Sequence, residues 1–66
     1  MVTLRFGNSG IVVRVLQRLL VSQGYMTRVD GNFGALTEVA VKAFQSQRQL
    51  KVDGIVGSIT WEQLTK

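Results

Sequence analysis

Hydrophobic residues recur at helical spacing in three segments of the chain, and a glycine stands just before each segment. The first segment runs from Ile11 to Gln23. Its apolar positions follow the i, i+3, i+4, i+7, i+8 spacing of an amphipathic helix: Val12, Val15, Leu16, Leu19 and Leu20. The polar residues fall largely off this face: Arg14, Gln17, Arg18 and Gln23. Gly24 comes next, where a left-handed residue commonly ends a helix.

The two later segments predict two further helices. The second, from Ala35 to Gln47 or Gln49, has its expected apolar face at Leu36, Val39, Ala40, Ala43 and Phe44. The third, from Ser58 to Leu64, is only about two turns long and carries Ile59, Trp61 and Leu64. The connecting segments each contain Asp-Gly, a turn signal, and allow at most isolated extended pairs. The predicted fold is therefore all-α, a compact three-helix domain over residues 1–66 with its core at about 4–64.

An internal repeat joins a loop to each of the last two helices. Residues 29–41 read VDGNFGALTEVAV and residues 52–64 read VDGIVGSITWEQL, with five identities at an offset of 23. A fainter copy of the glycine spacing lies at Gly7 and Gly10. After it, Val13, Leu16 and Gln17 match Val41, Phe44 and Gln45 at an offset of 28. Because this second match has a different register, we expect the two-copy loop-helix repeat to be the structural unit.

The repeated loop has a structural interpretation. Gly31 and Gly54 allow positive φ in a tight turn, and the preceding Asp30 and Asp53 can accept hydrogen bonds from backbone N–H groups just ahead. The next apolar residue, Phe33 or Val56, is expected to point into the core. Gly34 and Gly57 are expected at the helix N-caps, which leaves the first helical N–H groups free for a partner. A direct ligand role for these residues is the alternative.

Polar and aromatic residues outside the loops also favour structural roles. Gln17 and Gln45 each follow a core residue, and we expect them to satisfy buried backbone groups in a neighbouring loop. Trp61 is expected in the core, with partial exposure to a sugar ring as the alternative. For Tyr25 we expect one edge to pack while the hydroxyl faces solvent.

Composition narrows the possible chemistry. The 66 residues include no cysteine, histidine or proline, so the core depends on packing alone and the common zinc ligands are missing. Without histidine the usual proton shuttle is absent, and so short a chain leaves little volume for a cleft beside two carboxylates. We therefore predict no catalytic residues, no metal and no cofactor. Asp30-Gly31-Asn32 resembles the start of a calcium loop, but Val41 stands where the required Glu would be.

The net charge of +4 favours anionic partners, including acidic polymers of a cell envelope. The basic residues are spread along the chain, and no basic residue lies between Gly7 and Gly10, so nucleic-acid binding is not indicated. No apolar run is long enough for a membrane span. No signal peptide is visible, and we expect any export signal to lie outside this chain.

Taken together, the motifs resemble the peptidoglycan-binding type 1 domain. They are Gly-x-x-Gly-x-x-Val-x-x-Leu-Gln-x-x-Leu over residues 7–20, Val-Asp-Gly-x-Phe-Gly-x-x-Thr followed by Phe-Gln over 29–45, and Leu-x-Val-Asp-Gly-x-Val-Gly-x-x-Thr-Trp over 50–61. The resemblance implies a non-catalytic three-helix domain that holds a cell-wall hydrolase or amidase, in the same or a partner chain, against peptidoglycan. Ala35 and Ser58 stand where that family often has proline, and both suit a first helical turn.

The resemblance does not supply a binding site, because its signature residues are mostly the structural ones. For ligand contact we predict Tyr25, Arg28, Asp30, Asn32 and Arg48, since these polar residues surround the first Asp-Gly loop or lie near the end of the second helix. We expect a monomer in the cell envelope, periplasmic or extracellular. The alternative function is a protein-interaction or propeptide-like domain of the same fold that does not bind glycan.

Overall fold

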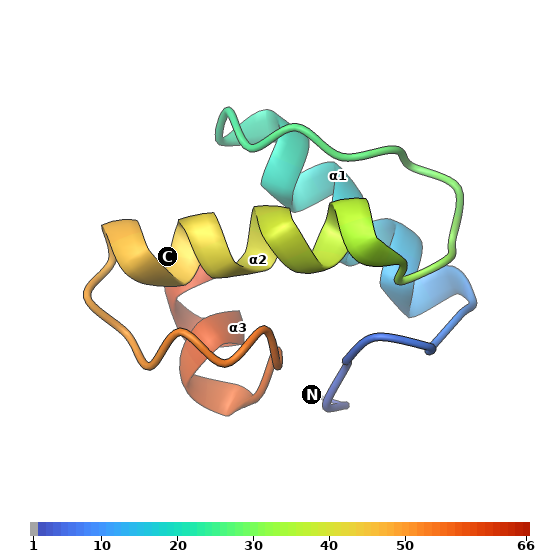
Figure 1. The fold of residues 1–66 in the computed structure, drawn as a ribbon. Helices are drawn as coiled ribbons and strands as arrows, with labels where there is room; N and C mark the ends of the chain where they lie inside the picture. The colour runs from blue at the N-terminus through green and yellow to red at the C-terminus, as the bar shows by residue number, and fades with distance from the viewer. Residues whose placement is uncertain (1) are drawn as a thin grey trace.

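Three helices make up the regular structure of the computed structural model, which describes residues 2–66. They are α1 (Ile11–Ser22), α2 (Ala35–Gln47) and α3 (Ser58–Leu64). α1 and α2 run in the same general direction, and the segment that joins them returns along α2 (Figure 1). Isolated antiparallel bridges pair Leu4 with Val56 and Ser9 with Asn32. The predicted all-α, three-helix fold is confirmed.

Glycines set the starts of all three helices. Gly10, Gly34 and Gly57 are the N-cap residues, and no side chain caps any of these helices. The first N–H groups of each helix are therefore left without a side-chain cap. The predicted N-cap positions of Gly34 and Gly57 are confirmed.

α1 and α2 end in the same way although only one of them is followed by glycine. Gly24 has φ of 92°, and the N–H of Tyr25 donates to the carbonyl of Leu20 over 2.9 Å. After α2, Gln49 has φ of 58° and the N–H of Leu50 donates to the carbonyl of Gln45 over 2.8 Å. Both ends have the hydrogen bond of a Schellman motif, which requires a left-handed residue. The predicted end of α1 at Gly24 is confirmed, and α2 ends at Gln47.

A single cluster of buried side chains forms the core. It draws on all three helices, the two repeated loops and the N-terminal segment: Leu4, Val13, Leu16, Leu20, Phe33, Ala40, Val41, Phe44, Val56, Trp61 and Leu64. Phe33 and Val56 point inward, as the loop motif predicted. Trp61 is buried as well, and its indole N–H donates to the carbonyl of Val2 over 2.7 Å, so the alternative of a sugar-facing Trp61 is wrong.

The predicted face of α1 was partly wrong. Val12 and Val15 are exposed, whereas Val13, Leu16, Gln17 and Leu20 are the buried residues of this helix. α1 carries apolar residues on more than one side, so spacing alone does not decide which side faces the core. The buried side includes Gln17, a polar residue that had been placed off the face.

The predicted face of α2 is likewise rotated from its buried side, whereas α3 buries Trp61 and Leu64 of its three apolar residues. Leu36, Val39 and Ala43 of α2 and Ile59 of α3 are exposed. Thr37 and Thr60 are buried in their place. The two threonines are the residues that receive hydrogen bonds from the buried glutamines, so their polar atoms are satisfied inside the protein.

Candidate functional site

Gln17 organises the first repeated loop from the middle of α1. Its Oε1 accepts hydrogen bonds from the backbone N–H groups of Asp30 (3.0 Å) and Gly31 (2.9 Å). Its Nε2 lies within donor distance of Asp30 Oδ1 (3.1 Å), the Asn32 carbonyl (3.0 Å) and Thr37 Oγ1 (3.0 Å). One buried amide thus ties α1, the loop and the first turn of α2 together.

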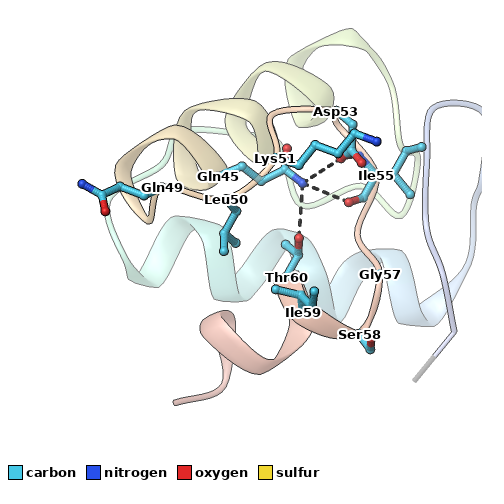
Figure 2. A pocket seen from close by; sticks show the side chains of 10 residues that line it. All are labelled: Gln45, Gln49, Leu50, Lys51, Asp53, Ile55, Gly57, Ser58, Ile59 and Thr60. Carbon is cyan, nitrogen blue, oxygen red and sulfur yellow. Dashed lines mark hydrogen bonds between the residues drawn. The ribbon is translucent and has the colours of Figure 1, made fainter.

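Gln45 does the same for the second loop from α2. Its Oε1 accepts from the N–H of Gly54 over 3.0 Å. Its Nε2 faces Asp53 Oδ1 (3.0 Å), the Ile55 carbonyl (2.9 Å) and Thr60 Oγ1 (3.2 Å), as Figure 2 shows. Each glutamine side chain is at most 1% exposed. The roles expected for Gln17 and Gln45 from the sequence match these bonds.

The two hydrogen-bonded units explain the two sequence offsets. Gln17 and Asp30 are 13 residues apart, whereas Gln45 and Asp53 are only eight apart. Of the five additional residues, three extend α1 beyond its glutamine, because α1 continues to Ser22 whereas α2 ends at Gln47, and two lengthen the connection to the first loop. The repeated unit is therefore a helix with its glutamine, a connection of variable length, and an Asp-Gly loop that leads into the next helix.

Each loop carboxylate is fixed by its own backbone. The N–H of Asn32 donates to Asp30 Oδ1 over 2.9 Å, and that of Ile55 donates to Asp53 Oδ1 over 2.9 Å. These backbone bonds are the largest cause that lowers the pKa of both carboxyls below 3.8, and the glutamine side chains lower it further. Arg28 and Lys51 also lower the pKa of Asp30 and Asp53, respectively, through their charge. Both carboxyls are therefore ionised at neutral pH.

A shallow hollow lies over each loop and the start of the helix that follows it. The first groove has a volume of about 270 Å³ and is lined by Thr27, Arg28, Asp30, Asn32, Gly34, Ala35, Leu36 and Thr37. The second groove has a volume of about 490 Å³ and is lined by Gln45, Gln49, Leu50, Lys51, Asp53, Ile55, Gly57, Ser58, Ile59 and Thr60 (Figure 2). Each groove combines a cation, a carboxylate and an exposed apolar residue of the following helix.

The structure separates the five residues predicted for ligand contact into two groups. Arg28, Asp30 and Asn32 line the first groove together. Tyr25 instead packs edge-to-face on Phe44, with ring centroids 5.5 Å apart. The guanidinium of Arg48 lies 5.0 Å from the centroid of the same ring, and its Nη2 donates to Gln23 Oε1 over 3.1 Å.

This division corrects the expected place of Tyr25, which the sequence put beside the first Asp-Gly loop. The sequence placed Tyr25 near the loop because it lies only three positions before Arg28. The connection after α1 runs along α2, however (Figure 1). Tyr25 and Arg48 both contact the ring of Phe44, so the two residues lie together near the end of α2.

Sequence reasoning missed the residues of the second groove as ligand candidates. Lys51 and Ile59 occupy the positions of Arg28 and Leu36 in the repeat, at an offset of 23. The repeat itself was the signal that could have identified them. No group of three or more His, Cys, Asp or Glu side chains suited to a metal ion occurs among residues 2–66. In the same range, no helix combines the length and apolar character needed to cross a membrane.

Comparison with known proteins assigns the chain to one family. The model of the peptidoglycan-binding domain family matches residues 9–64. An uncharacterized protein from Kitasatospora aureofaciens is 49% identical over 59 residues, which cover 86% of this chain and 50% of that protein. The zinc D-Ala-D-Ala carboxypeptidase of Streptomyces albus G is 40% identical over 65 residues, or 94% of this chain and 26% of the enzyme. The chain thus spans half or less of these two curated relatives.

A solved structure supports the same relationship. The peptidoglycan-binding protein from Clostridioides difficile, crystallised with glutamine hydroxamate, superposes with a TM-score of 0.94 at 41% identity. The match covers 96% of this chain and 40% of that protein. At this identity the similarity lies in the sequence as well as in the fold.

Proposed function

Because this chain belongs to the peptidoglycan-binding domain family, we propose that it is a non-catalytic module that holds an attached or partner cell-wall enzyme against the bacterial wall. The observation that carries the proposal is the family match over residues 9–64, nearly the whole chain. The carboxypeptidase relative is several times longer than the matched region, the arrangement expected when a binding domain is joined to an enzyme. The hydrolase or amidase role belongs to that enzyme and not to this domain.

We infer that the first groove contacts the polymer directly. Arg28 offers a guanidinium for the carboxylates of stem peptides, and the Asn32 side chain can hydrogen-bond to amide or N-acetyl groups. The Asp30 carboxylate is held in place beside them by Gln17 and the backbone. Tyr25 and Arg48 provide a separate, weaker contact, since both are already engaged with Phe44.

A weak contact is sufficient for this function. Joining a binding domain to an enzyme raises the effective concentration of the enzyme near the polymer, so modest affinity per site still retains it. We infer that the domain acts as a monomer outside the cytoplasm, where peptidoglycan lies.

Co-sedimentation with insoluble sacculi, stripped of protein and accessory polymers, tests the proposal at low and moderate salt. We expect retention at both salt concentrations and no release of soluble muropeptides. Arg28→Ala should reduce retention, Arg48→Ala should reduce it less, and Lys66→Ala, at the exposed C-terminal residue, is the matched control.

Two other outcomes would contradict this function. Retention at low salt alone would reduce binding to charge attraction by a protein of net charge +4. No retention at either salt concentration would favour the protein-interaction or propeptide-like alternative.

A further inference from the structure

The second groove repeats the first position by position. Every residue that lines the first groove has a counterpart 23 positions later that lines the second. Arg28 corresponds to Lys51, for example, and Leu36 to Ile59. A buried glutamine, an Asx turn and a threonine hold both loops through the same kinds of hydrogen bond. The side chains that line the two grooves are therefore carried by equivalent loops.

The side chains that line the two grooves differ in polarity at three positions, and at one of them Ala35 of the first groove is replaced by Ser58 in the second. Thr27 and Asn32 of the first groove are replaced by Leu50 and Ile55 in the second. The cation and the carboxylate are kept, as Lys51 and Asp53. The second groove is thus the larger of the two, it has aliphatic side chains at two positions where the first has polar ones, and it retains a positive charge at its rim.

The placement of these groups defines the ligand that would fit. Lys51 and Asp53 lie on the loop, while Ile59 projects from α3, and Ile59 is 65% exposed (Figure 2). Asp53 Oδ1 already accepts bonds from Ile55 and Gln45, so the carboxylate mainly serves to fix the loop. The groove therefore offers one flexible ammonium group beside exposed aliphatic side chains, which suits a carboxylate next to small apolar groups.

We propose that the second groove is a subsite for the peptide part of peptidoglycan. Lys51 pairs with a free carboxylate of the stem peptide, while Ile55 and Ile59 cover the methyl groups of its alanine residues. The first groove, through Arg28 and Asn32, takes a carboxylate and the amide groups of the same or a neighbouring repeat unit. The proposal rests on the proposed function and adds a second, chemically distinct subsite, so that one module can contact a repeating polymer at two points.

Chemical-shift mapping by ¹H–¹⁵N NMR with muramyl dipeptide tests the subsite, with N-acetylglucosamine trimer as the glycan control. We expect muramyl dipeptide to shift the backbone amides of residues 50–60. Lys51→Gln should raise its Kd about three- to fivefold, the effect of one exposed ion pair. Ile59→Ser should raise the Kd by a comparable factor through lost apolar contact.

Two matched controls separate the groove from general effects of charge and hydrophobicity. Lys66→Gln removes a positive charge away from the groove, and Val39→Ser replaces an exposed aliphatic residue of α2 that lines neither groove. Both should bind muramyl dipeptide as the unsubstituted domain does. The four variants replace exposed side chains, so each should remain folded, which their NMR spectra will verify.

Several results would overturn the subsite. Shifts confined to the first groove, or equal Kd values for Lys51→Gln, Ile59→Ser and the controls, would place the peptide elsewhere. Shifts of residues 50–60 by the glycan trimer alone would exclude the peptide assignment. If sacculi still retained the domain in these cases, the wall-binding function would stand without the second subsite, whereas loss of sacculus binding would remove the function itself.

Discussion

Gln45 occupies a core position at 1% exposure, and its side-chain amide satisfies polar groups of the second loop. Replacing it with leucine keeps the volume but leaves the N–H of Gly54 and the carbonyl of Ile55 without their partner. We expect Gln45→Leu to lower the free energy of unfolding by about 2–4 kcal/mol, since each unsatisfied buried polar group costs about 1–3 kcal/mol. Urea denaturation would measure the change.

The matched control for this change is Gln47→Leu, an exposed glutamine on the same helix, for which a change within about 0.5 kcal/mol is expected. Equal stabilities for the two variants would show that the loop does not need the glutamine. The sequence indicated that Gln45 satisfies backbone groups of a neighbouring loop, because glutamine recurs beside a core residue in α1 and α2, but it did not identify those groups as Gly54 and Ile55.

The two loop aspartates give the domain a predictable response to acid. The pKa of each is lowered in the folded state, chiefly by a backbone hydrogen bond. Their stabilising contribution is therefore complete above the pKa of the unfolded chain, near 3.8, and is lost as the pH falls through the folded-state pKa values. We expect the melting temperature to fall between pH 5 and pH 2, and the double variant Asp30→Asn, Asp53→Asn to show a smaller fall.

Thermal melts across this pH range, followed by circular dichroism, would measure the effect. Glu62→Gln is the control, because Glu62 is an exposed carboxylate on α3 outside both loops. This variant should keep the acid response of the unsubstituted domain. An equally steep fall in the double aspartate variant would contradict the assignment.

At the scale of helices and loops, the sequence predicted where the helices begin and end better than which side of each helix is buried. Glycines fix the starts of α1, α2 and α3 through backbone geometry. Because this geometry is local, it can be predicted from the sequence. The buried side of α1 could not be predicted from the sequence, because the exposed Val12 and Val15 are as apolar as the buried Val13. Which side faces inward depends on where Gln17 must stand to reach the loop, and this is a tertiary requirement.

Gly54 tests how strictly the repeated turn is specified. It has φ of 73°, and an added Cβ would lie 3.1 Å from Lys42 Cε and 3.2 Å from Glu38 Cγ. Both neighbours are flexible side-chain atoms that can move, so the left-handed backbone sets most of the cost. We expect Gly54→Ala to destabilise the domain by about 1–2 kcal/mol, measured by urea denaturation.

Gly57, only three residues later, provides the control for the turn. It has φ of −96°, nothing lies within 4 Å of an added Cβ, and it is the N-cap of α3. A serine there can accept a hydrogen bond from the first turn, so Gly57→Ser should leave stability unchanged or raise it by a few tenths of a kcal/mol. Similar losses in both variants would argue against a special backbone at Gly54.

Across the whole molecule, the equivalence of the two grooves could be predicted only partly from the sequence. The shared Asp-Gly-x-x-Gly pattern predicted equivalent loops at an offset of 23, and the structure adds the grooves above them. The glutamines that support the loops match at 28 instead. Only the fold shows that three more helical residues after Gln17 and a connection two residues longer reconcile the two offsets. Tyr25 packs on Phe44 whereas Arg28 lines the first groove, because the connection that holds both residues extends along α2 (Figure 1).

The N-terminal segment closes the core against the second loop, a long-range contact that no periodicity in residues 2–10 predicted. Leu4 is 6% exposed, and its N–H and carbonyl both pair with Val56, over 3.1 Å and 2.8 Å. The indole of Trp61 is tied to the same segment through the Val2 carbonyl. Because one cluster of buried side chains includes Leu4 and residues of all three helices, we expect the domain to unfold as a unit.

Leu4→Ala tests this coupling between the two ends of the chain. We expect it to lower the free energy of unfolding by about 2–4 kcal/mol, the cost of a cavity in a small core, whereas Met26→Ala, at a residue 86% exposed, should change it by less than about 0.5 kcal/mol. Urea transitions followed by Trp61 fluorescence and by far-ultraviolet circular dichroism should shift together. If the fluorescence transition shifted alone, the N-terminal segment would unfold independently of the helices. The stability of the helices and of both grooves would then not depend on that segment.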